Sequence, residues 1–232
     1  MIKLTIIIPV YNEIKTIEKL IKKILKINIK KQLIIVDDGS SDGTRLVLTK
    51  YKNRIDNLIF HKKNLGKGAA IKSGQKYVKG KYVGIQDADL EYDPKDLKKI
   101  VNEMYKKNLK VMYGSRVLKK NKFKNTQNFT HIVRIWGNIL LTKASNFLNR
   151  QKLTDAHTCY KVFDSKIFKK IKLKEKGFSF CPEITTKISM MNIDIEEFPI
   201  NYIGRTYEEG KKITAFDGID ALYVLAKYRY FK

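Results

Sequence analysis

Short apolar runs of strand length alternate with amphipathic helical segments through residue 86 of the chain. The apolar runs cover residues 4–10, 33–36, 58–61 and 82–86. The segments between them, at about 15–27, 44–51 and 68–78, read as helices. Apolar strands without a polar face are buried on both sides, and strands separated by helices pair in parallel. The alternation therefore predicts an α/β fold in which helices flank a mostly parallel, Rossmann-like sheet.

The second half of the chain is less regular. Residues 110–114 read as a strand, and residues 132–148 and 217–232 as amphipathic helices. The expected buried face of the 132–148 helix consists of Ile135, Trp136, Ile139, Leu140 and Phe147. The 217–232 helix is rich in Tyr and Lys, which fits either a segment at a membrane surface or an ordinary packed helix. Because no repeat or linker is visible, we expect a single domain over residues 1–232.

The chain carries a large excess of positive charge. It has 48 Lys and Arg against 23 Asp and Glu, a formal net charge of +25. Such an excess favours anionic partners such as nucleic acid, lipid headgroups or phosphorylated substrates, although lysine spread over the whole chain also fits a solvated surface.

The two cysteines, Cys159 and Cys181, show no metal-ligand spacing, so neither a disulfide framework nor a zinc site is expected. No apolar stretch approaches the roughly 20 residues of a membrane span. We expect a cytoplasmic protein, at most peripheral at the cytosolic face of a membrane.

An acidic cluster follows the fourth apolar run directly. Asp87, Asp89 and Glu91 place three carboxylates at the end of a buried strand. Mutual repulsion makes this arrangement costly unless a cation lies among them, and oxygen ligands suit Mg²⁺ or Mn²⁺. The alternative is a solvated acidic turn before the helix that Asp93 and Pro94 would begin. In parallel sheets ligands bind at the carboxyl ends of the strands, which favours the metal interpretation.

Two further polar loops follow buried strands. Gly39 and Gly43 allow a tight turn after the second strand, and Ser41 or Asp42 could cap the next helix. Asp38 could accept hydrogen bonds from a nucleobase or a ribose. The glycine-rich residues 64–68 lack the pattern of a nucleotide-binding P-loop. We interpret them as a closely packed helix start.

Taken together, these segments resemble the family 2 glycosyltransferases of the GT-A fold. The matching segments are 9–13 (PVYNE), 36–44 (VDDGSSDGT), 64–69 (NLGKGA) and 87–89 (DAD). The segments 87–94 (DADLEYDP), 114–116 (GSR) and 205–211 (RTYEEGK) further resemble the branch that contains the dolichyl-phosphate and polyprenyl-phosphate mannosyltransferases. The resemblance covers most of the chain and is looser after residue 116.

The resemblance implies a function and a set of site residues. Residues 1–116 would form the nucleotide-sugar-binding half and residues 117–232 the acceptor-side half. The nucleoside would be held by Pro9, Tyr11, Glu13, Val36 and Asp38. The diphosphate and the metal would be faced by Asp87, Ala88 and Asp89, with Asp89 as the principal ligand and Glu91 standing where the branch usually has glutamine. Phosphates of donor or acceptor would be bound by Arg116, Arg205 and Lys211.

The reaction implied is an inverting, metal-dependent transfer of a hexose from GDP-mannose or UDP-glucose to a polyprenyl or dolichyl phosphate. Its expected catalytic residues are Asp89 and Arg116. A phosphate acceptor needs no general base, whereas a sugar hydroxyl in glycan or glycolipid synthesis needs one. Glu183 is the candidate base for that alternative, although a glutamate after Pro182 also fits a helix start. Residues 155–161 (DAHTCYK) depart from the branch, which leaves the acceptor open.

Two other classes of protein share single features of this chain. A non-catalytic nucleic-acid-binding protein would explain the charge but not the acidic residues at strand ends. A nucleotidyltransferase would explain the carboxylates, but it normally has a glycine-rich loop near its first strand, where this chain has Pro9 to Glu13. We therefore expect a nucleotide-sugar enzyme without a nucleic-acid partner.

Overall fold

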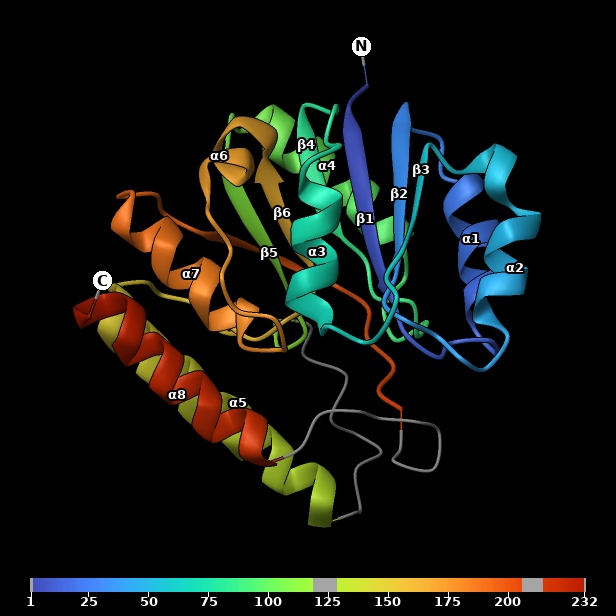
Figure 1. Ribbon diagram of the computed structural model, residues 1–232. Helices are drawn as coiled ribbons and strands as arrows, with labels where there is room; N and C mark the ends of the chain where they lie inside the picture. The colour runs from blue at the N-terminus through green and yellow to red at the C-terminus, as the bar shows by residue number, and fades with distance from the viewer. Residues whose placement is uncertain (1, 119–128, 206–214, 232) are drawn as a thin grey trace.

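The computed structural model describes residues 2–118, 129–205 and 215–231. The first two of these ranges build one sheet, and the third contributes a helix (Figure 1). Its strands are β1 (Leu4–Val10), β2 (Lys31–Asp37), β3 (Asn57–Phe60), β4 (Tyr82–Ile85), β5 (Val111–Ser115), β6 (Lys161–Asp164) and β7 (Glu196–Pro199). The helices are α1 (Ile17–Leu25), α2 (Thr44–Lys50), α3 (Lys67–Gln75), α4 (Lys95–Lys106), α5 (Phe129–Asn149), α6 (Ser165–Lys170), α7 (Phe180–Met190) and α8 (Ala215–Tyr230), with a short 3₁₀ turn, η1 (Lys52–Arg54).

The sheet has the order β3-β2-β1-β4-β6-β5-β7. Strands β1, β2, β3 and β4 are parallel, as the apolar runs predict. Strand β6 is antiparallel to both β4 and β5, and β7 is parallel to β5. The sequence patterns did not anticipate β6 and β7. These strands come from the second half of the chain, so both halves build one continuous sheet.

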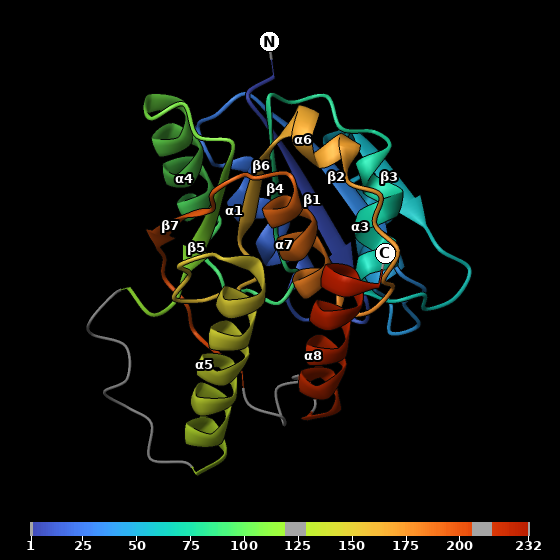
Figure 2. The same cartoon turned by 90° about the vertical axis from the view of Figure 1, so that its left-hand side faces the viewer.

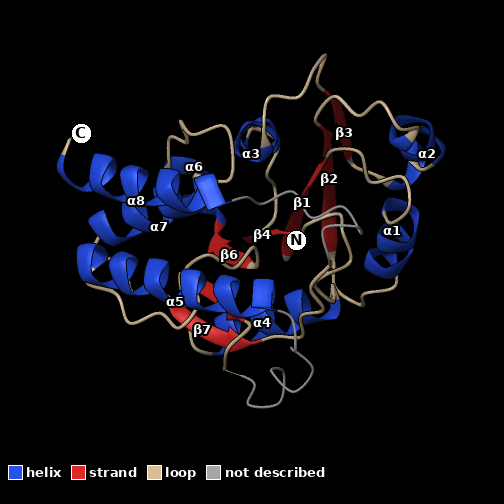
Figure 3. Cartoon of the chain, turned by 90° about the horizontal axis from the view of Figure 1, so that it is seen from below, coloured by secondary structure: helices blue, strands red, loops and turns tan. Residues whose placement is uncertain are grey.

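The core lies in two layers because successive strand side chains point to opposite faces. On β1, Ile6 and Ile8 pack against α1 and α4, whereas Ile7 packs against α3. Figure 3 shows α1, α2 and α4 on one side of the sheet and α3, α6 and α7 on the other. The apolar runs are thus buried on both faces, which confirms the predicted fold class.

The carboxyl ends of β1, β2 and β4 meet at one edge of the sheet, the lower edge in Figure 1. The loops that leave this edge carry the polar clusters that stand out in the sequence. Helices α5 and α8 lie side by side outside α7 and extend below this edge (Figures 1 and 2). The helical pair therefore extends past the edge of the sheet from which these polar loops leave.

The prediction for the buried face of α5 was wrong for three of its five residues, while Ile139 is half-buried and the side chain of Ile135 lies outside the description. Trp136, Leu140 and Phe147 are exposed, whereas the polar residues Thr142 and Ser145 are buried. Further polar contacts fix this inner face: the Thr142 hydroxyl accepts the N–H of Ala156 at 3.2 Å. Amphipathic spacing alone predicts only that an apolar face exists, and here that face lies outward. The described part of the chain contains no helix that is long and apolar enough to cross a membrane.

Candidate active site

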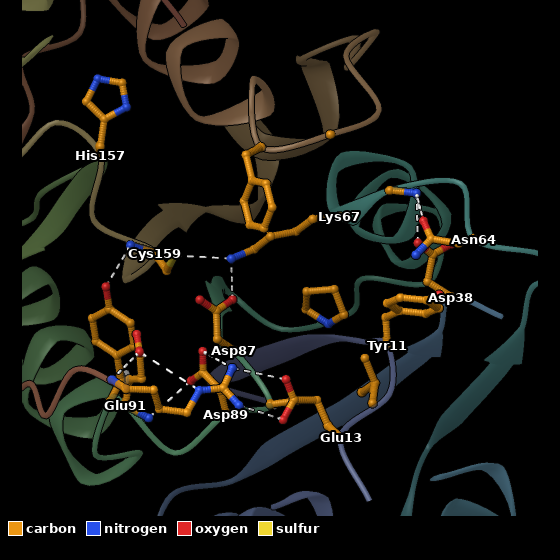
Figure 4. Close-up of a pocket in the computed structure, with 18 of the residues that line it drawn as sticks. Tyr11, Glu13, Asp38, Asn64, Lys67, Asp87, Asp89, Glu91, His157 and Cys159 are labelled. Carbon is orange, nitrogen blue, oxygen red and sulfur yellow. Dashed lines mark hydrogen bonds and ion pairs between the residues drawn. The ribbon is translucent and has the colours of Figure 1, made fainter. Parts of the chain in front are cut away.

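A cavity of about 350 Å³ opens at the carboxyl edge of the sheet (Figure 4). It lies among the loops that follow β1, β2, β4 and β5. Ten of the residues predicted from the sequence line it: Pro9, Tyr11, Glu13, Asp38, Asp87, Ala88, Asp89, Glu91, Arg116 and Arg205. The fold thus brings together side chains that are spread over some two hundred residues of sequence.

The loop after β1 is fixed by the loop after β2. Asn12 has a left-handed backbone (φ 50°), and its N–H donates to the Ser40 hydroxyl at 2.9 Å. The N–H of Glu13 donates to the Thr44 hydroxyl at 3.0 Å. These bonds hold Tyr11 and Glu13 at the cavity, where Figure 4 shows both side chains.

Asp38 holds the loop that precedes α3. Its carboxylate accepts the N–H groups of Leu65 at 2.9 Å and Gly66 at 2.7 Å, and it lies 2.6 Å from Nδ1 of His61. Asp38 lines the cavity while these contacts are made. It therefore shapes this part of the cavity in addition to lining it.

The start of α3 is closed by the loop before α7. The N–H of Ala69 donates to the Lys176 carbonyl at 3.1 Å, and that of Gly68 to the Gly177 carbonyl at 3.3 Å. A Cβ at Gly68 would lie 2.3 Å from the Glu175 carbonyl oxygen, so no larger residue fits. This contact confirms the interpretation of residues 64–68 as a closely packed helix start.

Lys67 is a cavity residue that the sequence patterns did not reveal. Its ammonium group forms an ion pair with Asp87 and lies 3.1 Å from the Cys159 sulfur. Both charged side chains are nearly buried, at 11% and 12% exposure. Burial opposes the charge of Lys67, but Asp87 outweighs it and raises the lysine pKa well above its ordinary value. The signal available in the sequence was a lysine between two glycines at a helix start.

Asp89 and Glu91 lie on a turn that a left-handed residue makes possible. Leu90 has φ 65°, a strained conformation for a branched side chain. The turn lets the N–H of Glu91 donate to the Asp89 carboxylate at 3.1 Å. Burial, together with the charges of Asp87 and Glu91, raises the pKa of Asp89. Because these surroundings disfavour the negatively charged form of Asp89, a cation bound beside it would be stabilising.

Arg205 supplies the cation that these carboxylates contact. Its terminal nitrogens lie 3.1 Å from both oxygens of Glu13, and one of them lies 3.3 Å from Asp89. Its backbone N–H donates to Glu91 at 2.7 Å. Carboxylate oxygens are the donor set of hard divalent ions, and these already surround one positive group, so their chemistry fits Mg²⁺ or Mn²⁺. In the described residues no three such side chains are already arranged as a metal site.

Arg116 also lines the cavity. Its guanidinium forms two parallel bonds to Asp155, at 2.6 Å and 2.7 Å, and lies over the Tyr202 ring, 5.2 Å from its centre. His157 lines the cavity nearby, and burial, reinforced by the charge of Lys161, lowers its pKa to about 4. Near neutral pH this part of the cavity therefore presents a rigid cation and a neutral imidazole.

Two of the predicted site residues that the structure describes do not line the cavity. Val36 is fully buried in the core beside Ile7. Glu183 is also fully buried, and its two oxygens accept the N–H groups of Lys174 at 2.7 Å and Glu175 at 2.9 Å. Glu183 thus anchors the loop before α7. Lys211 lies outside the described residues.

Aromatic side chains complete the lining. Tyr92, Phe178 and Tyr202 all face the cavity, and none of them stood out in the sequence. Tyr92 stacks on Tyr160 with ring centres 4.7 Å apart. Their positions depend on contacts between distant segments, such as the bridge between Tyr92 and Tyr202, so local sequence patterns carry no signal for them.

Similar proteins include enzymes named for polyprenyl phosphates. A UDP-N-acetylglucosamine–dolichyl-phosphate N-acetylglucosaminyltransferase of Methanococcus voltae is 27% identical, over 95% of this chain and 93% of its own length. A dolichyl-phosphate beta-glucosyltransferase of Dictyostelium discoideum is 29% identical, over 93% of this chain and 70% of its own. A dodecaprenyl-phosphate galacturonate synthase of Rhizobium johnstonii is 26% identical over 78% of this chain, which spans only 53% of that relative.

Solved structures share the fold. Glucosyl-3-phosphoglycerate synthase from Mycobacterium tuberculosis, in complex with Mn²⁺, UDP and phosphoglyceric acid, matches 99% of this chain and 79% of its own with a TM-score of 0.70 at 13% identity. TarS from S. aureus, in complex with UDP-GlcNAc, matches 98% of this chain and 66% of its own with a TM-score of 0.64 at 16% identity. Both likenesses support the GT-A fold.

The family model for glycosyl transferase family 2 matches residues 5–172. The match includes β1 to β6 and therefore most of the cavity, and it covers well over half of the 232 residues. The chain belongs to glycosyl transferase family 2, an enzyme family, and adopts its GT-A fold.

Proposed function

We propose that this chain transfers a hexose, with inversion and with a divalent metal, from a nucleotide-sugar to a polyprenyl or dolichyl phosphate. GDP-mannose and UDP-glucose are the proposed donors. The observation that carries the proposal is one cavity in which Asp87, Asp89 and Glu91 lie among the cations Lys67, Arg116 and Arg205. Relatives named for polyprenyl-phosphate acceptors, which match most of this chain, support the choice of acceptor.

The donor would occupy the end of the cavity between Tyr11 and Asp89. The nucleoside would lie against Pro9, Tyr11, Glu13 and Asp38, with its diphosphate toward Asp89. A bound Mg²⁺ or Mn²⁺, held by Asp89 with Asp87 and Glu91, would neutralise charge on the departing diphosphate. Lys67 keeps Asp87 in place, and Arg205 offers a guanidinium that matches phosphate geometry.

The state of the cavity carboxylates supports a phosphate acceptor. Each of them is already engaged: Asp38 by backbone N–H groups, Asp87 by Lys67, and the cluster of Glu13, Asp89 and Glu91 by Arg205. A hydroxyl acceptor would need one of them free as a base, whereas a phosphate is already anionic. Glu183, the candidate base of the alternative, faces the loop before α7. We therefore favour the phosphate.

Arg116 would hold that acceptor phosphate. Its fork to Asp155 fixes the plane of the guanidinium, and 23% of the side chain stays exposed. The neutral His157 beside it adds no competing charge. Transfer would then occur between Asp89 and Arg116, across the cavity.

A lipid acceptor requires contact with a membrane, and α5 and α8 offer a surface for it. Trp136, Leu140 and Phe147 on α5 and Phe216, Ile219 and Tyr223 on α8 are 63% to 83% exposed. The two helices pack together and extend past the edge of the sheet that holds the cavity (Figure 1). Exposed apolar and aromatic residues on a strongly basic chain fit the surface of an anionic bilayer. We propose peripheral binding through this face, without a nucleic-acid partner.

Titration calorimetry with UDP and GDP tests the donor site. Binding of one of the two should require Mn²⁺ and should be lost in Asp89→Asn, while the surface variant Arg54→Gln should behave as wild type. The nucleotide that binds identifies the base. If neither nucleotide binds in a metal-dependent way, the proposed function is wrong.

A further inference from the structure

The Arg205 guanidinium lies at the centre of a carboxylate cluster formed by Glu13, Asp89 and Glu91. It contacts Glu13 through two nitrogens at 3.1 Å and Asp89 at 3.3 Å, and its Nε lies 3.9 Å from Glu91. Figure 4 shows the three acidic side chains converging at the floor of the cavity. The guanidinium therefore contacts two of the three proposed metal ligands, Asp89 and Glu91.

Among the described residues, Asp89 and Glu91 share the charge of one guanidinium. The neighbouring cation Lys67 is paired with Asp87 instead. The side chains of the cluster are mostly buried, with 17% exposure for Arg205 and 8% to 15% for the three acids. Because buried like charges repel, a doubly charged ion would stabilise Asp89 and Glu91 more than a guanidinium does.

The guanidinium is also incompletely satisfied. Its Nε is buried and has no hydrogen-bond acceptor in the described part of the chain. An unpaired buried donor costs free energy, so this side-chain position is less stable than a fully bonded one. Moving the guanidinium out of the cluster therefore requires less free energy than its two contacts to Glu13 alone would indicate.

The backbone of Arg205 is held separately from its side chain. Its N–H donates to the Glu91 carboxylate at 2.7 Å, and the N–H of Ile203 donates to the Glu91 carbonyl at 2.9 Å. The pairing of Tyr92 with Tyr202 fixes the preceding residues. A change of the Arg205 side-chain rotamer can therefore move the guanidinium without moving this segment.

We propose that the Arg205 guanidinium takes the place of the divalent cation in the ligand-free protein and is exchanged for it when a nucleoside diphosphate enters. The proposal rests on the proposed function, because it assumes that metal and diphosphate bind here. The diphosphate offers the displaced guanidinium new anionic oxygens in the same cavity. Metal alone should then bind weakly, and metal with nucleotide tightly.

Binding of Mn²⁺ in the absence of nucleotide tests this exchange directly. If the cluster is free of the guanidinium about one-tenth of the time, apparent metal affinity is lowered about tenfold. Arg205→Gln should therefore bind Mn²⁺ alone at least about tenfold more tightly than wild type. Arg205→Lys keeps a positive charge and should bind Mn²⁺ weakly, and Arg54→Gln removes an equal but exposed charge and should behave as wild type.

A second measurement does not depend on the glutamine variant. In the wild-type protein the Nε–H NMR signal of Arg205, assigned by its loss in Arg205→Lys, should shift when Mg²⁺ and nucleotide are added together. Mg²⁺ alone at the same concentration should leave it nearly unchanged. A signal that does not move with metal and nucleotide together would show that the guanidinium stays in the cluster, and would overturn the proposal.

Different results would contradict the proposed function and the exchange of cations. Wild-type protein that binds neither UDP nor GDP with Mn²⁺ contradicts the proposed function itself. Wild-type protein that does so, while folded Arg205→Gln binds Mn²⁺ alone no more tightly than wild type, contradicts only the exchange.

Discussion

The ammonium group of Lys67, at the first turn of α3, forms a nearly buried ion pair with Asp87 at the end of β4. The pair joins two loops that are adjacent only in the folded chain. The two neighbouring aspartates therefore have different partners. Asp87 is paired with Lys67, whereas Asp89 contacts Arg205.

A double-mutant cycle on this pair should show strong coupling. Lys67→Met leaves the Asp87 charge nearly buried and unpaired, so it should destabilise the protein, and Asp87→Asn in the same chain should restore part of the loss. We expect a coupling free energy of about 1–3 kcal/mol from urea unfolding. The solvent-exposed pair Lys22 and Glu18 is the control and should show much weaker coupling. Additive effects at Lys67 and Asp87 would show that the pair contributes nothing.

Glu183→Gln should reduce stability more than it reduces activity. The Glu183 carboxylate accepts two backbone N–H groups and pairs with Lys187, so the amide loses a charged acceptor in the core. The expected loss is about 1–3 kcal/mol in the free energy of unfolding. Activity per folded molecule, with a phosphate acceptor, should stay within a few-fold of wild type. Full stability with abolished transfer would instead identify Glu183 as a catalytic residue.

The cavity end near Arg116 should make stability depend on pH. Burial and the charge of Lys161 lower the pKa of His157 from 6.5 to about 4, with Asp155 acting in the opposite direction and Arg116 in the same one. Below pH 6.5 the unfolded chain therefore binds a proton that the folded chain excludes. Stability is lost as pH falls from about 6.5 to about 4.

Replacing His157 tests this dependence. Unfolding midpoints of His157→Gln should change less than those of wild type between pH 6.5 and pH 4, because the variant has no imidazole to protonate. Parallel pH profiles for the two proteins would mean that other groups cause the loss.

The sequence reveals a site residue when a local pattern places that residue in the site, and not when distant contacts do. Asp87, Asp89 and Glu91 follow a buried strand, and that local pattern places them correctly at the edge of the sheet. Val36 comes from an equally good match, yet alternation along β2 turns its side chain into the core. A motif specifies which backbone segment borders the site, and the strand pleat decides which side chains reach it.

The second half of the chain shows the limit more clearly. Strand β6 enters the sheet between β4 and β5, a pairing that no local pattern indicates. The apolar face of α5 points outward because polar contacts such as that of Thr142 fix its inner face. Such arrangements follow from tertiary contacts, which a single sequence does not display.

Trp136 is the only tryptophan of the chain and should report membrane contact. It is 67% exposed on the outer face of α5, so its emission should shift to the blue when anionic vesicles are added. Phe216→Ser and Ile219→Ser should weaken co-sedimentation with the same vesicles, while Leu46→Ser, at an exposed site on α2, should not. Unchanged emission together with no co-sedimentation would exclude this face as the membrane contact.

The most direct measurement is transfer of labelled hexose from GDP-mannose and UDP-glucose to polyprenyl phosphate in vesicles, with Mn²⁺ or Mg²⁺. We predict a labelled lipid product with one of these donors, no product after chelation of the metal, and a loss of about a hundredfold or more in Asp89→Asn. Free sugars and glycolipids offered as hydroxyl acceptors should stay unlabelled. Labelling of a hydroxyl acceptor instead of the lipid phosphate, or lipid transfer that persists without metal, would contradict the account.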